Sequence, residues 1–187
     1  MLEKIIILDC GSQVTTLIGR RLREAGIYCE IQPFHKAIDF DGSVKGVIIS
    51  GSPCSVNDAN APTIDIPAIE EHVPVLGICY GAQFMAKLFG GEVKASGSRE
   101  YGRAHLSILK NNPLFEGVPG GTTVWMSHGD SITALPADAE LLGSTESLVN
   151  AAFRFKGRKV YGLQFHPESI LTPEGKTMLQ NFINLET

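Results

Sequence analysis

A cysteine flanked by two glycines stands between an apolar segment and a helical pattern, and this junction restricts the fold more than any other feature. Residues 77–81 read Gly-Ile-Cys-Tyr-Gly and follow the apolar pair Val75 and Leu76. A strand that ends there must turn sharply into a helix and expose the thiol of Cys79 at the turn. Glycine suits such a turn because a side chain would crowd the backbone. The pattern predicts a nucleophile elbow, where the helix N-terminus favours thiolate over thiol.

A buried structural cysteine is the alternative, since many cysteines behave as small core residues. A second segment favours the nucleophile. Residues 160–165 predict a strand, and His166, Pro167 and Glu168 follow it at once. A histidine and a carboxylate two residues apart at a strand end can supply a base and the group that orients it. Alone this pair would indicate a surface turn, but together with Cys79 it predicts a Cys-His-Glu triad.

Composition indicates one globular domain over residues 1–187, with 43% hydrophobic and 19% charged residues. The net charge of −4 gives no electrostatic footprint for nucleic acid, and the basic cluster at residues 20–23 predicts the solvated face of a helix. No apolar run approaches the roughly 20 residues that span a bilayer, and the N-terminus lacks a signal-peptide pattern. We expect a cytoplasmic protein that binds neither nucleic acid nor membrane.

The cysteines and histidines are too scattered for a metal site. The sequence has four cysteines without a Cys-x-x-Cys pair, and its five histidines lack metal-ligand spacing. We therefore expect neither a disulfide framework nor a bound metal. Cys10 and Cys29 lie in or beside apolar runs and are predicted to be core residues.

Strand and helix patterns alternate through the first half. Apolar strands are predicted at residues 4–8, 27–31 and 46–50, and a helix begins at Gln13 and ends before Gly26. A long loop follows, and then a short helical stretch before the elbow strand. This alternation predicts a mostly parallel central sheet with helices on both faces.

The second half predicts a small antiparallel extension and a last helix. Its strand candidates are residues 104–109, 122–126, 140–144, 151–155 and 159–165. Some of them alternate polar and apolar residues, as antiparallel or edge strands do. The last helix is predicted to begin with Thr172 as N-cap and Pro173 at its first position.

Together these motifs resemble the class I, triad-type glutamine amidotransferases over essentially the whole chain. The elbow at residues 77–83 and the pair His166 and Glu168 match that family's central signatures. The resemblance implies a three-layer, flavodoxin-like α/β fold. Three further segments look like the glutaminase domain of GMP synthetases; they are residues 7–13, 98–102 and 125–130.

The chemistry implied is hydrolysis of the side-chain amide of L-glutamine. Cys79 would attack the amide carbon, His166 would move the protons, and Glu168 would orient the imidazole. The backbone N–H groups of Ser52 and Tyr80 would bind the oxyanion. By the same resemblance the amino-acid end of glutamine would lie against Gly51, Gln83, Ser127, His128 and Gly129. Without the resemblance, residues 127–130 would be taken for a polar turn after a strand.

Two segments depart from the pattern. The family's Ser-Gly-Gly-Pro loop is here Ser50, Gly51, Ser52 and Pro53, and a requirement for positive φ would make the serine costly. The segment 166–172 looks more like the glutamine subunit of anthranilate or aminodeoxychorismate synthase, which leaves the acceptor enzyme open.

The chain lacks the Ser-Gly-Gly-x-Asp-Ser loop of an ATP-pyrophosphatase and any Walker phosphate loop. The resemblance therefore implies a partner domain or subunit, namely an ATP-pyrophosphatase that converts XMP to GMP. ATP and magnesium would belong to that partner, and no cofactor is expected in this chain. The alternatives are a chorismate-pathway acceptor, a Cys-His-Glu peptidase or γ-glutamyl hydrolase, and a non-catalytic binding module.

Overall fold

The computed structural model describes residues 2–185, without the side chains of residues 97–100. A nine-stranded mixed sheet forms its centre, in the order β2-β1-β3-β4-β9-β8-β7-β5-β6. The strands are β1 (Lys4–Asp9), β2 (Cys29–Pro33), β3 (Val44–Ile49), β4 (Val75–Ile78), β5 (Glu92–Ile108), β6 (Thr122–Ala134), β7 (Ala139–Ser144), β8 (Ala152–Phe155) and β9 (Val160–Leu163).

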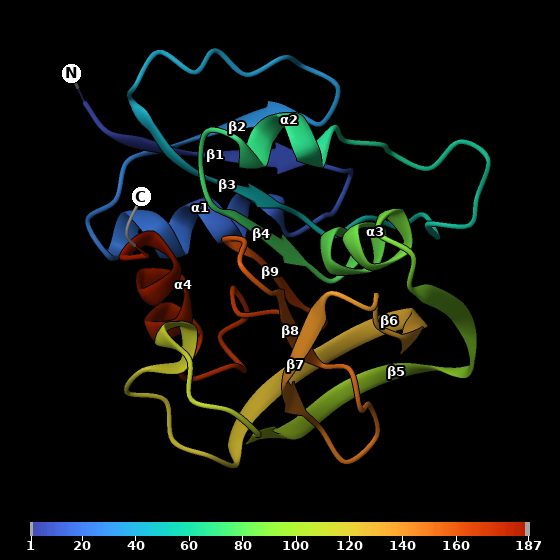
Figure 1. Cartoon of the computed structure of the whole chain (residues 1–187). Helices are drawn as coiled ribbons and strands as arrows, with labels where there is room; N and C mark the ends of the chain where they lie inside the picture. The colour runs from blue at the N-terminus through green and yellow to red at the C-terminus, as the bar shows by residue number, and fades with distance from the viewer. Residues whose placement is uncertain (1, 186–187) are drawn as a thin grey trace.

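Helices cover both faces of the parallel part of the sheet (Figure 1). They are α1 (Thr15–Glu24), α2 (Ile66–Glu70), α3 (Tyr80–Leu88) and α4 (Gly175–Ile183), with a short 3-10 turn η1 (Pro113–Phe115). Side chains of α1 and α4 share one apolar cluster, whereas those of α2 and α3 share another. This arrangement confirms the predicted three-layer α/β fold with an antiparallel extension.

The alternation of side chains along β1 shows how one strand serves both layers. Ile5 and Ile7 belong to the cluster on the α1 and α4 face, whereas Ile6 and Leu8 belong to the cluster on the α2 and α3 face. Successive side chains of a strand point to opposite faces, so a continuous apolar run buries on both. The run at the start of the sequence therefore requires a strand inside the sheet, next to β2 and β3.

The parallel pairing brings several loops to one edge. Strands β3, β4 and β9 are neighbours and run parallel, so the residues that follow them gather at their shared carboxyl edge. The loop after β3 begins at Ser50, the elbow after β4 holds Cys79, and the segment after β9 leads to His166. The fold alone thus assembles residues from three distant parts of the sequence.

The antiparallel strands β5 and β6 are much longer than the sequence patterns predict. They pair along most of their length, and the register shifts between Ala95 and Glu100. Residues 127–130 lie inside β6, so the alternative of a polar turn at this place is wrong. Cross-strand pairing with β5 keeps this polar segment extended, a contact that the local sequence does not show.

The start of the last helix also differs from the prediction. Helix α4 begins at Gly175 with Glu174 as N-cap, so the prediction that Thr172 caps the helix is wrong. Thr172 is buried, donates a hydrogen bond from Oγ1 to the carbonyl of His166 (2.8 Å) and accepts one from the N–H of Trp125 (2.9 Å). Its hydroxyl ties the segment after β9 to β6 instead of capping a helix.

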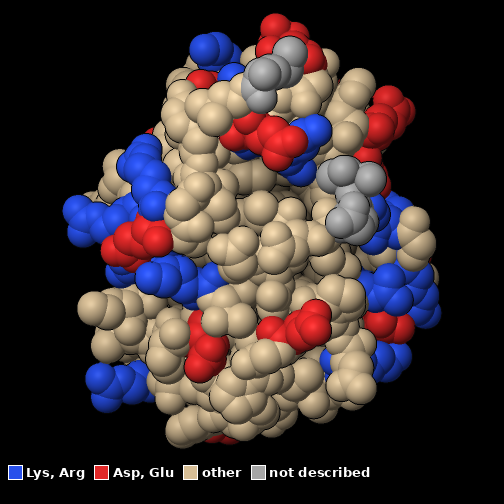
Figure 2. All heavy atoms as spheres, turned by 90° about the vertical axis from the view of Figure 1, so that its left-hand side faces the viewer, with Lys and Arg blue, Asp and Glu red and all other residues tan. Residues whose placement is uncertain are grey.

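The prediction that the basic cluster at residues 20–23 is solvated is correct for Arg20 and Arg23, which are exposed on α1. Arg21 is half-buried and donates from Nε to the backbone carbonyl of Glu168 (3.1 Å), which that prediction missed. The face on the left-hand side of Figure 1 carries basic and acidic side chains in small mixed groups (Figure 2). A surface of this kind provides no single-sign patch for a polyanion on the face shown.

Candidate active site

The elbow has the strained geometry that the sequence predicts. Cys79 has φ 52° and ψ −102°, the one positive φ among non-glycine residues in the described part of the chain. A Cβ on Gly77 would lie 2.5 Å from the carbonyl carbon of Gly81, and one on Gly81 would lie 2.7 Å from the carbonyl oxygen of Ile49. Both glycines are required because backbone atoms fill the space of a side chain. Strain at a tight strand–helix turn is typical of a nucleophile.

His166 and Glu168 form a buried pair. His166 Nδ1 lies 3.1 Å from Glu168 Oε1, and the Glu168 side chain is 1% exposed. Burial opposes charge on the imidazole, but the Glu168 carboxylate and the nearby sulfur of Cys79 outweigh it and raise the pKa of His166 well above its usual value. The pair therefore favours the imidazolium form.

Cys79 and His166 meet at one carbonyl oxygen. The Sγ of Cys79 lies 3.6 Å from the Ser127 oxygen, and Nε2 of His166 lies 3.4 Å from the same atom. The backbone of β6 thus brings the thiol and the imidazole to a common point. The structure thus brings the side chains of Cys79, His166 and Glu168 to one place, and their role as a catalytic triad stays a prediction.

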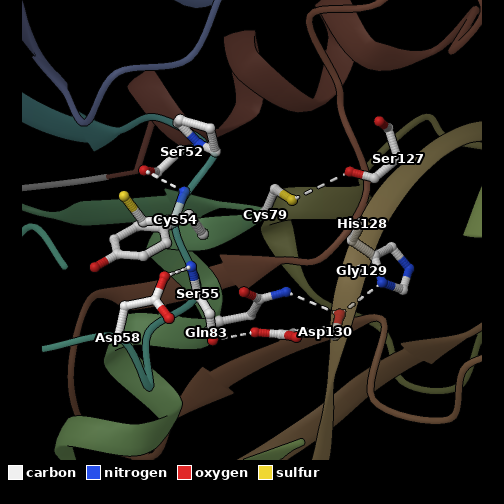
Figure 3. A pocket seen from close by; sticks show the side chains of 12 residues that line it. Ser52, Cys54, Ser55, Asp58, Cys79, Gln83, Ser127, His128, Gly129 and Asp130 are labelled. Atoms are coloured by element: carbon white, nitrogen blue, oxygen red, sulfur yellow. Dashed lines mark hydrogen bonds between the residues drawn. The ribbon is translucent and has the colours of Figure 1, made fainter. Parts of the chain in front are cut away.

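A polar pocket of about 330 Å³ opens beside Cys79. Figure 3 shows the thiol of Cys79 directed at Ser127, and the amide nitrogen of Gln83 directed at Asp130. Of the residues expected to bind substrate or oxyanion, those that line the pocket are Ser52, Tyr80, Gln83, Ser127, His128 and Gly129. Gly51 lies next to them, because a Cβ there would be 3.7 Å from His166 and 3.8 Å from Cys79.

The serine at position 52 fits the loop without strain. Cys79 is the one non-glycine residue with positive φ in the described part, so Ser52 does not adopt the left-handed conformation. Its hydroxyl accepts a hydrogen bond from the N–H of Cys54 (3.1 Å) and closes a tight turn. The departure from the family's second glycine therefore imposes no conformational cost here.

Sequence patterns missed part of the pocket wall, namely Cys54, Ser55 and Asp58 in the loop after β3. Asp130, which belongs to the resembling segment 125–130, also lines the pocket. Ser55 connects the two sides, since its Oγ donates to Oδ2 of Asp130 (2.5 Å) and its N–H donates to Oδ2 of Asp58 (2.9 Å). The side chain of Ser55 thus joins the loop after β3 to β6. The polar composition of the loop was the only local signal, and it did not distinguish these residues.

The other cysteines are poor candidates for the nucleophile. Cys10 and Cys29 are buried, which confirms the prediction that they are core residues. Burial raises the pKa of Cys10 to about 12 and also raises the pKa of Cys29. Cys54 lines the pocket but lies in a loop without a helix N-terminus at its thiol.

Residues 98–100 of the segment that resembles GMP synthetases lie outside the described side chains. In the same segment Tyr101 is 59% exposed and Gly102 has φ 131°. Among the side chains that the structure describes, no group of histidine, cysteine and carboxylate residues could hold a metal ion. No helix in the described part is long and apolar enough to cross a membrane.

The fold and the elbow define an α/β protein with a cysteine, a histidine and a glutamate at the carboxyl edge of a parallel sheet. The sequence matches the family model of glutamine amidotransferase class-I over residues 6–185. The chain therefore belongs to the class I glutamine amidotransferase family.

Several curated relatives of this chain share one description, GMP synthase [glutamine-hydrolyzing]. The chain is 55% identical over 184 residues to a GMP synthase [glutamine-hydrolyzing] of Bacteroides fragilis, and 52% identical over 184 residues to that of Cytophaga hutchinsonii. Each match covers 98% of this chain but only 36% of the relative. The chain thus spans about a third of the length of these curated relatives.

Solved structures confirm the fold. A protein from Thermoplasma acidophilum, described as a proposed subunit of GMP synthase, superposes with a TM-score of 0.85 and 33% identity, covering 98% of this chain and 93% of that one. A glutamine amidotransferase from Thermotoga maritima superposes with a TM-score of 0.78 at 19% identity, covering 98% and 96%.

Proposed function

We propose that this chain hydrolyses the side-chain amide of L-glutamine and supplies the ammonia to a synthetase that aminates XMP to GMP. The observation that carries the proposal is the meeting of Cys79 and His166 at the Ser127 carbonyl, beside a pocket with the size and polarity for one amino acid. Membership of the amidotransferase family supports the same chemistry.

In the first half of the reaction, the Cys79 thiolate attacks the amide carbon of glutamine and forms a tetrahedral oxyanion. His166 then gives its proton to the amide nitrogen, the C–N bond breaks, and ammonia leaves a thioester on Cys79. The raised pKa of His166 suits this step because the imidazolium is the proton donor. Glu168 stabilises that cation.

In the second half, neutral His166 takes a proton from water, and the resulting hydroxide attacks the thioester. The C–S bond breaks, and glutamate and the Cys79 thiolate are released. We assign oxyanion binding in both halves to the backbone N–H groups of Tyr80 and Ser52. Loss of one such donor costs about 3 kcal/mol of barrier.

The polar wall of the pocket would bind the amino-acid end of the substrate. Glutamine carries a cationic α-ammonium group, and the carboxylates of Asp58 and Asp130 line the pocket. Gln83, Ser127, His128 and Gly129 would complete the recognition through backbone and side-chain groups. Asp130 is the carboxylate we expect to matter most, because it is on the same strand as Ser127.

A glutaminase assay on matched variants tests the chemistry. Cys79→Ala should lose activity, whereas Cys54→Ala, a cysteine that lines the same pocket, should retain it. A diazo-ketone analogue of glutamine should label Cys79 alone in wild type. Labelling of another cysteine, activity in Cys79→Ala, or hydrolysis of short peptides in preference to glutamine would contradict the proposal.

The acceptor is proposed from the relatives. They are described as GMP synthases, and nearly two thirds of their length lies outside the match. We propose that an ATP-pyrophosphatase domain or subunit supplies that part, together with the sites for ATP and magnesium, and that this chain needs no cofactor of its own. We further propose that the protein acts in the cytoplasm.

The partner would dock over the triad. A second cavity of about 140 Å³ reaches His166 and Glu168 and shares Ser127 with the first, and Val14, Leu17 and Trp125 line it. An opening on this side suits transfer of ammonia away from the pocket without release into bulk water. We expect low glutaminase turnover in the chain alone and a strong rise on docking.

Reconstitution tests the acceptor. The chain is mixed with an ATP-pyrophosphatase, XMP, ATP and glutamine, and GMP formation and glutamine turnover are measured. GMP formation with a rise in turnover is expected. Equal turnover with and without the partner would contradict the coupling. Stimulation by an anthranilate synthase large subunit, with none by the ATP-pyrophosphatase, would assign the chain to the chorismate pathway instead.

A further inference from the structure

A fully buried glutamine lies directly behind the nucleophile. Gln164 follows β9, is 0% exposed and does not line the substrate pocket. Its N–H donates to the carbonyl of Ala151 (2.8 Å), and the carbonyl of the preceding Leu163 accepts from the N–H of Cys79 (2.7 Å). The backbone therefore fixes where the Gln164 side chain begins relative to the elbow.

A chain of hydrogen bonds sets the orientation of the Gln164 amide. The Asp130 carbonyl can only accept, so the group of Gln83 that lies 3.0 Å from it must be the NH₂. The same nitrogen lies 3.3 Å from Gln164, which must therefore present its oxygen there. The Gln164 nitrogen then faces the sulfur of Cys79 at 3.8 Å. The reverse orientation would set two NH₂ groups against each other.

This chain of hydrogen bonds joins the substrate pocket to the nucleophile. Gln83 lines the pocket, and Gln164 contacts the sulfur from inside the protein, whereas His166 approaches the same region by way of the Ser127 carbonyl. A hydrogen-bond donor beside sulfur favours the thiolate over the thiol. A buried side-chain amide is costly unless its polar atoms form hydrogen bonds. Here the nitrogen of Gln164 bonds to the Cys79 sulfur, and its oxygen accepts from Gln83.

We propose that Gln164 is a positioning residue that holds the Cys79 sulfur as the thiolate and locks the Gln83 carboxamide in its pocket orientation. The proposal deepens the proposed glutaminase function and rests on the roles of Cys79 and Gln83 given there. Gln164 acts through these two residues and does not itself touch substrate.

Alkylation of Cys79 against pH tests the proposal without any substrate. The full chain is treated with iodoacetamide, and the Cys79 peptide is quantified by mass spectrometry. Only the thiolate reacts, so the midpoint of the profile reports how well the site stabilises it. Gln164→Met keeps the length of the side chain and removes the donor. We expect the midpoint to move up by about 0.7 pH unit, a fall of roughly fivefold in rate on the acid side, as for the loss of one hydrogen bond of ordinary net strength.

A charged variant gives a stronger version of the test. Gln164→Glu keeps the acceptor for Gln83 and sets a carboxylate near the sulfur, so the midpoint should move up further than in Gln164→Met. Gln180→Met, on α4 and away from the pocket, is the matched control and should leave the profile unchanged. With glutamine as substrate, Gln164→Met should lower kcat.

The remaining cysteines report on the fold in the same sample. Cys10 and Cys29 are buried and should stay protected from iodoacetamide. Unchanged Cys79 profiles in both Gln164 variants, with Cys10 and Cys29 protected, would overturn the proposal. If these two thiols become reactive, the fold of the Gln164 variant has loosened. The Cys79 midpoint in Gln83→Met then tests the proposal instead.

Gln83→Met removes the donor that orients Gln164. It should raise KM for glutamine. It should also move the Cys79 midpoint up by way of Gln164, because the Gln83 side chain is bonded to Gln164 and Asp130. A raised KM with an unmoved midpoint would overturn the coupling. Because alkylation needs no glutamine, the two proposals can fail separately. A shifted midpoint in a chain that hydrolyses no glutamine, even when mixed with the ATP-pyrophosphatase, would refute the proposed function and leave the role of Gln164 standing.

Discussion

The two halves of the sheet contribute to the site in different ways. The parallel half presents side chains: Cys79, His166 and Glu168 come from the ends of β4 and β9. The antiparallel half presents backbone: β6 gives the carbonyl of Ser127 to Cys79 and His166, and the carbonyl of Asp130 to Gln83. A main-chain carbonyl acts the same way whatever side chain the residue carries. The reacting groups thus depend on sequence, whereas much of the wall that aligns them depends on strand pairing.

This difference predicts how substitutions divide between kcat and KM. Changes at the ends of the parallel strands should act on the chemical step, since the proposed mechanism assigns bond formation and proton transfer to Cys79 and His166. Changes in β6 should act on KM through the pocket wall.

Glu168→Gln should have the largest effect. The variant keeps the shape of the side chain but removes the charge that stabilises the His166 imidazolium, so kcat should fall by about 10³- to 10⁴-fold with little change in KM. Ser127→Ala keeps the carbonyl that both triad members contact and should lower kcat by less than about tenfold. Steady-state kinetics on both variants provides the check. Similar losses in kcat would show that the β6 wall depends on side chains after all.

The same division explains what the sequence could reveal. The elbow around Cys79 and the segment at His166 are local signals, because a tight turn between a buried strand and a helix needs particular residues at fixed positions. The turn requires glycine at positions 77 and 81, and the structure shows backbone atoms where the side chains of other residues would lie. The fold class followed from alternating apolar runs for the same reason.

The parts that the sequence did not reveal depend on contacts distant in the chain. The extent of β5 and β6 comes from their mutual pairing, which no local pattern encodes. Thr172 looked like a helix cap, but its hydroxyl bonds to His166 and Trp125. The link from Ser55 to Asp130 spans 75 residues, and only the folded chain brings these polar side chains together.

The next largest effect is expected on the free energy of unfolding of two glycine variants. They show which half of the sheet is packed more tightly. A Cβ on Gly81 would meet the backbone oxygen of Ile49 at 2.7 Å. One on Gly143 in β7 would first meet the side chain of Leu106 at 2.9 Å, with the backbone oxygen of Ser107 farther away at 3.2 Å. Backbone moves less easily than a side-chain methyl group, so Gly81→Ala should lower the free energy of unfolding by about 3 kcal/mol and Gly143→Ala by about 1 kcal/mol.

Gly120→Ala is the matched control for this pair, because nothing lies within 4 Å of its Cβ position and its φ is not positive. Its free energy of unfolding should change by less than about 0.5 kcal/mol. Urea titration of the three variants measures the order. A larger loss for Gly143→Ala than for Gly81→Ala would place the tighter packing in the antiparallel half.

Asp130→Asn should have a moderate effect that falls on KM. The substitution removes a carboxylate from the pocket wall but keeps the backbone carbonyl that orients Gln83. Loss of one charge-assisted contact with the α-ammonium group should raise KM for glutamine roughly tenfold and change kcat by less than about threefold. Asp39→Asn, in an exposed loop, is the control. A fall in kcat with an unchanged KM would connect Asp130 to the chemical step and weaken the contrast between the halves.

The smallest effect expected is on stability against pH, and it belongs to the parallel half. The pKa of His166 is raised in the folded protein, chiefly because Glu168 and the Cys79 sulfur outweigh burial. A group whose pKa rises on folding binds more protons in the native state. The contribution of His166 to stability is therefore complete at pH values below its pKa in the unfolded chain, near 6.5. It is lost as the pH increases from there through the pKa of the folded state. Urea unfolding of wild type should show a free energy that declines across this range relative to Glu168→Gln, where the charge that raises the pKa is absent. Equal slopes in the two proteins would mean that the pair is not charged in the folded state, and the imidazolium assigned as proton donor would lose its support.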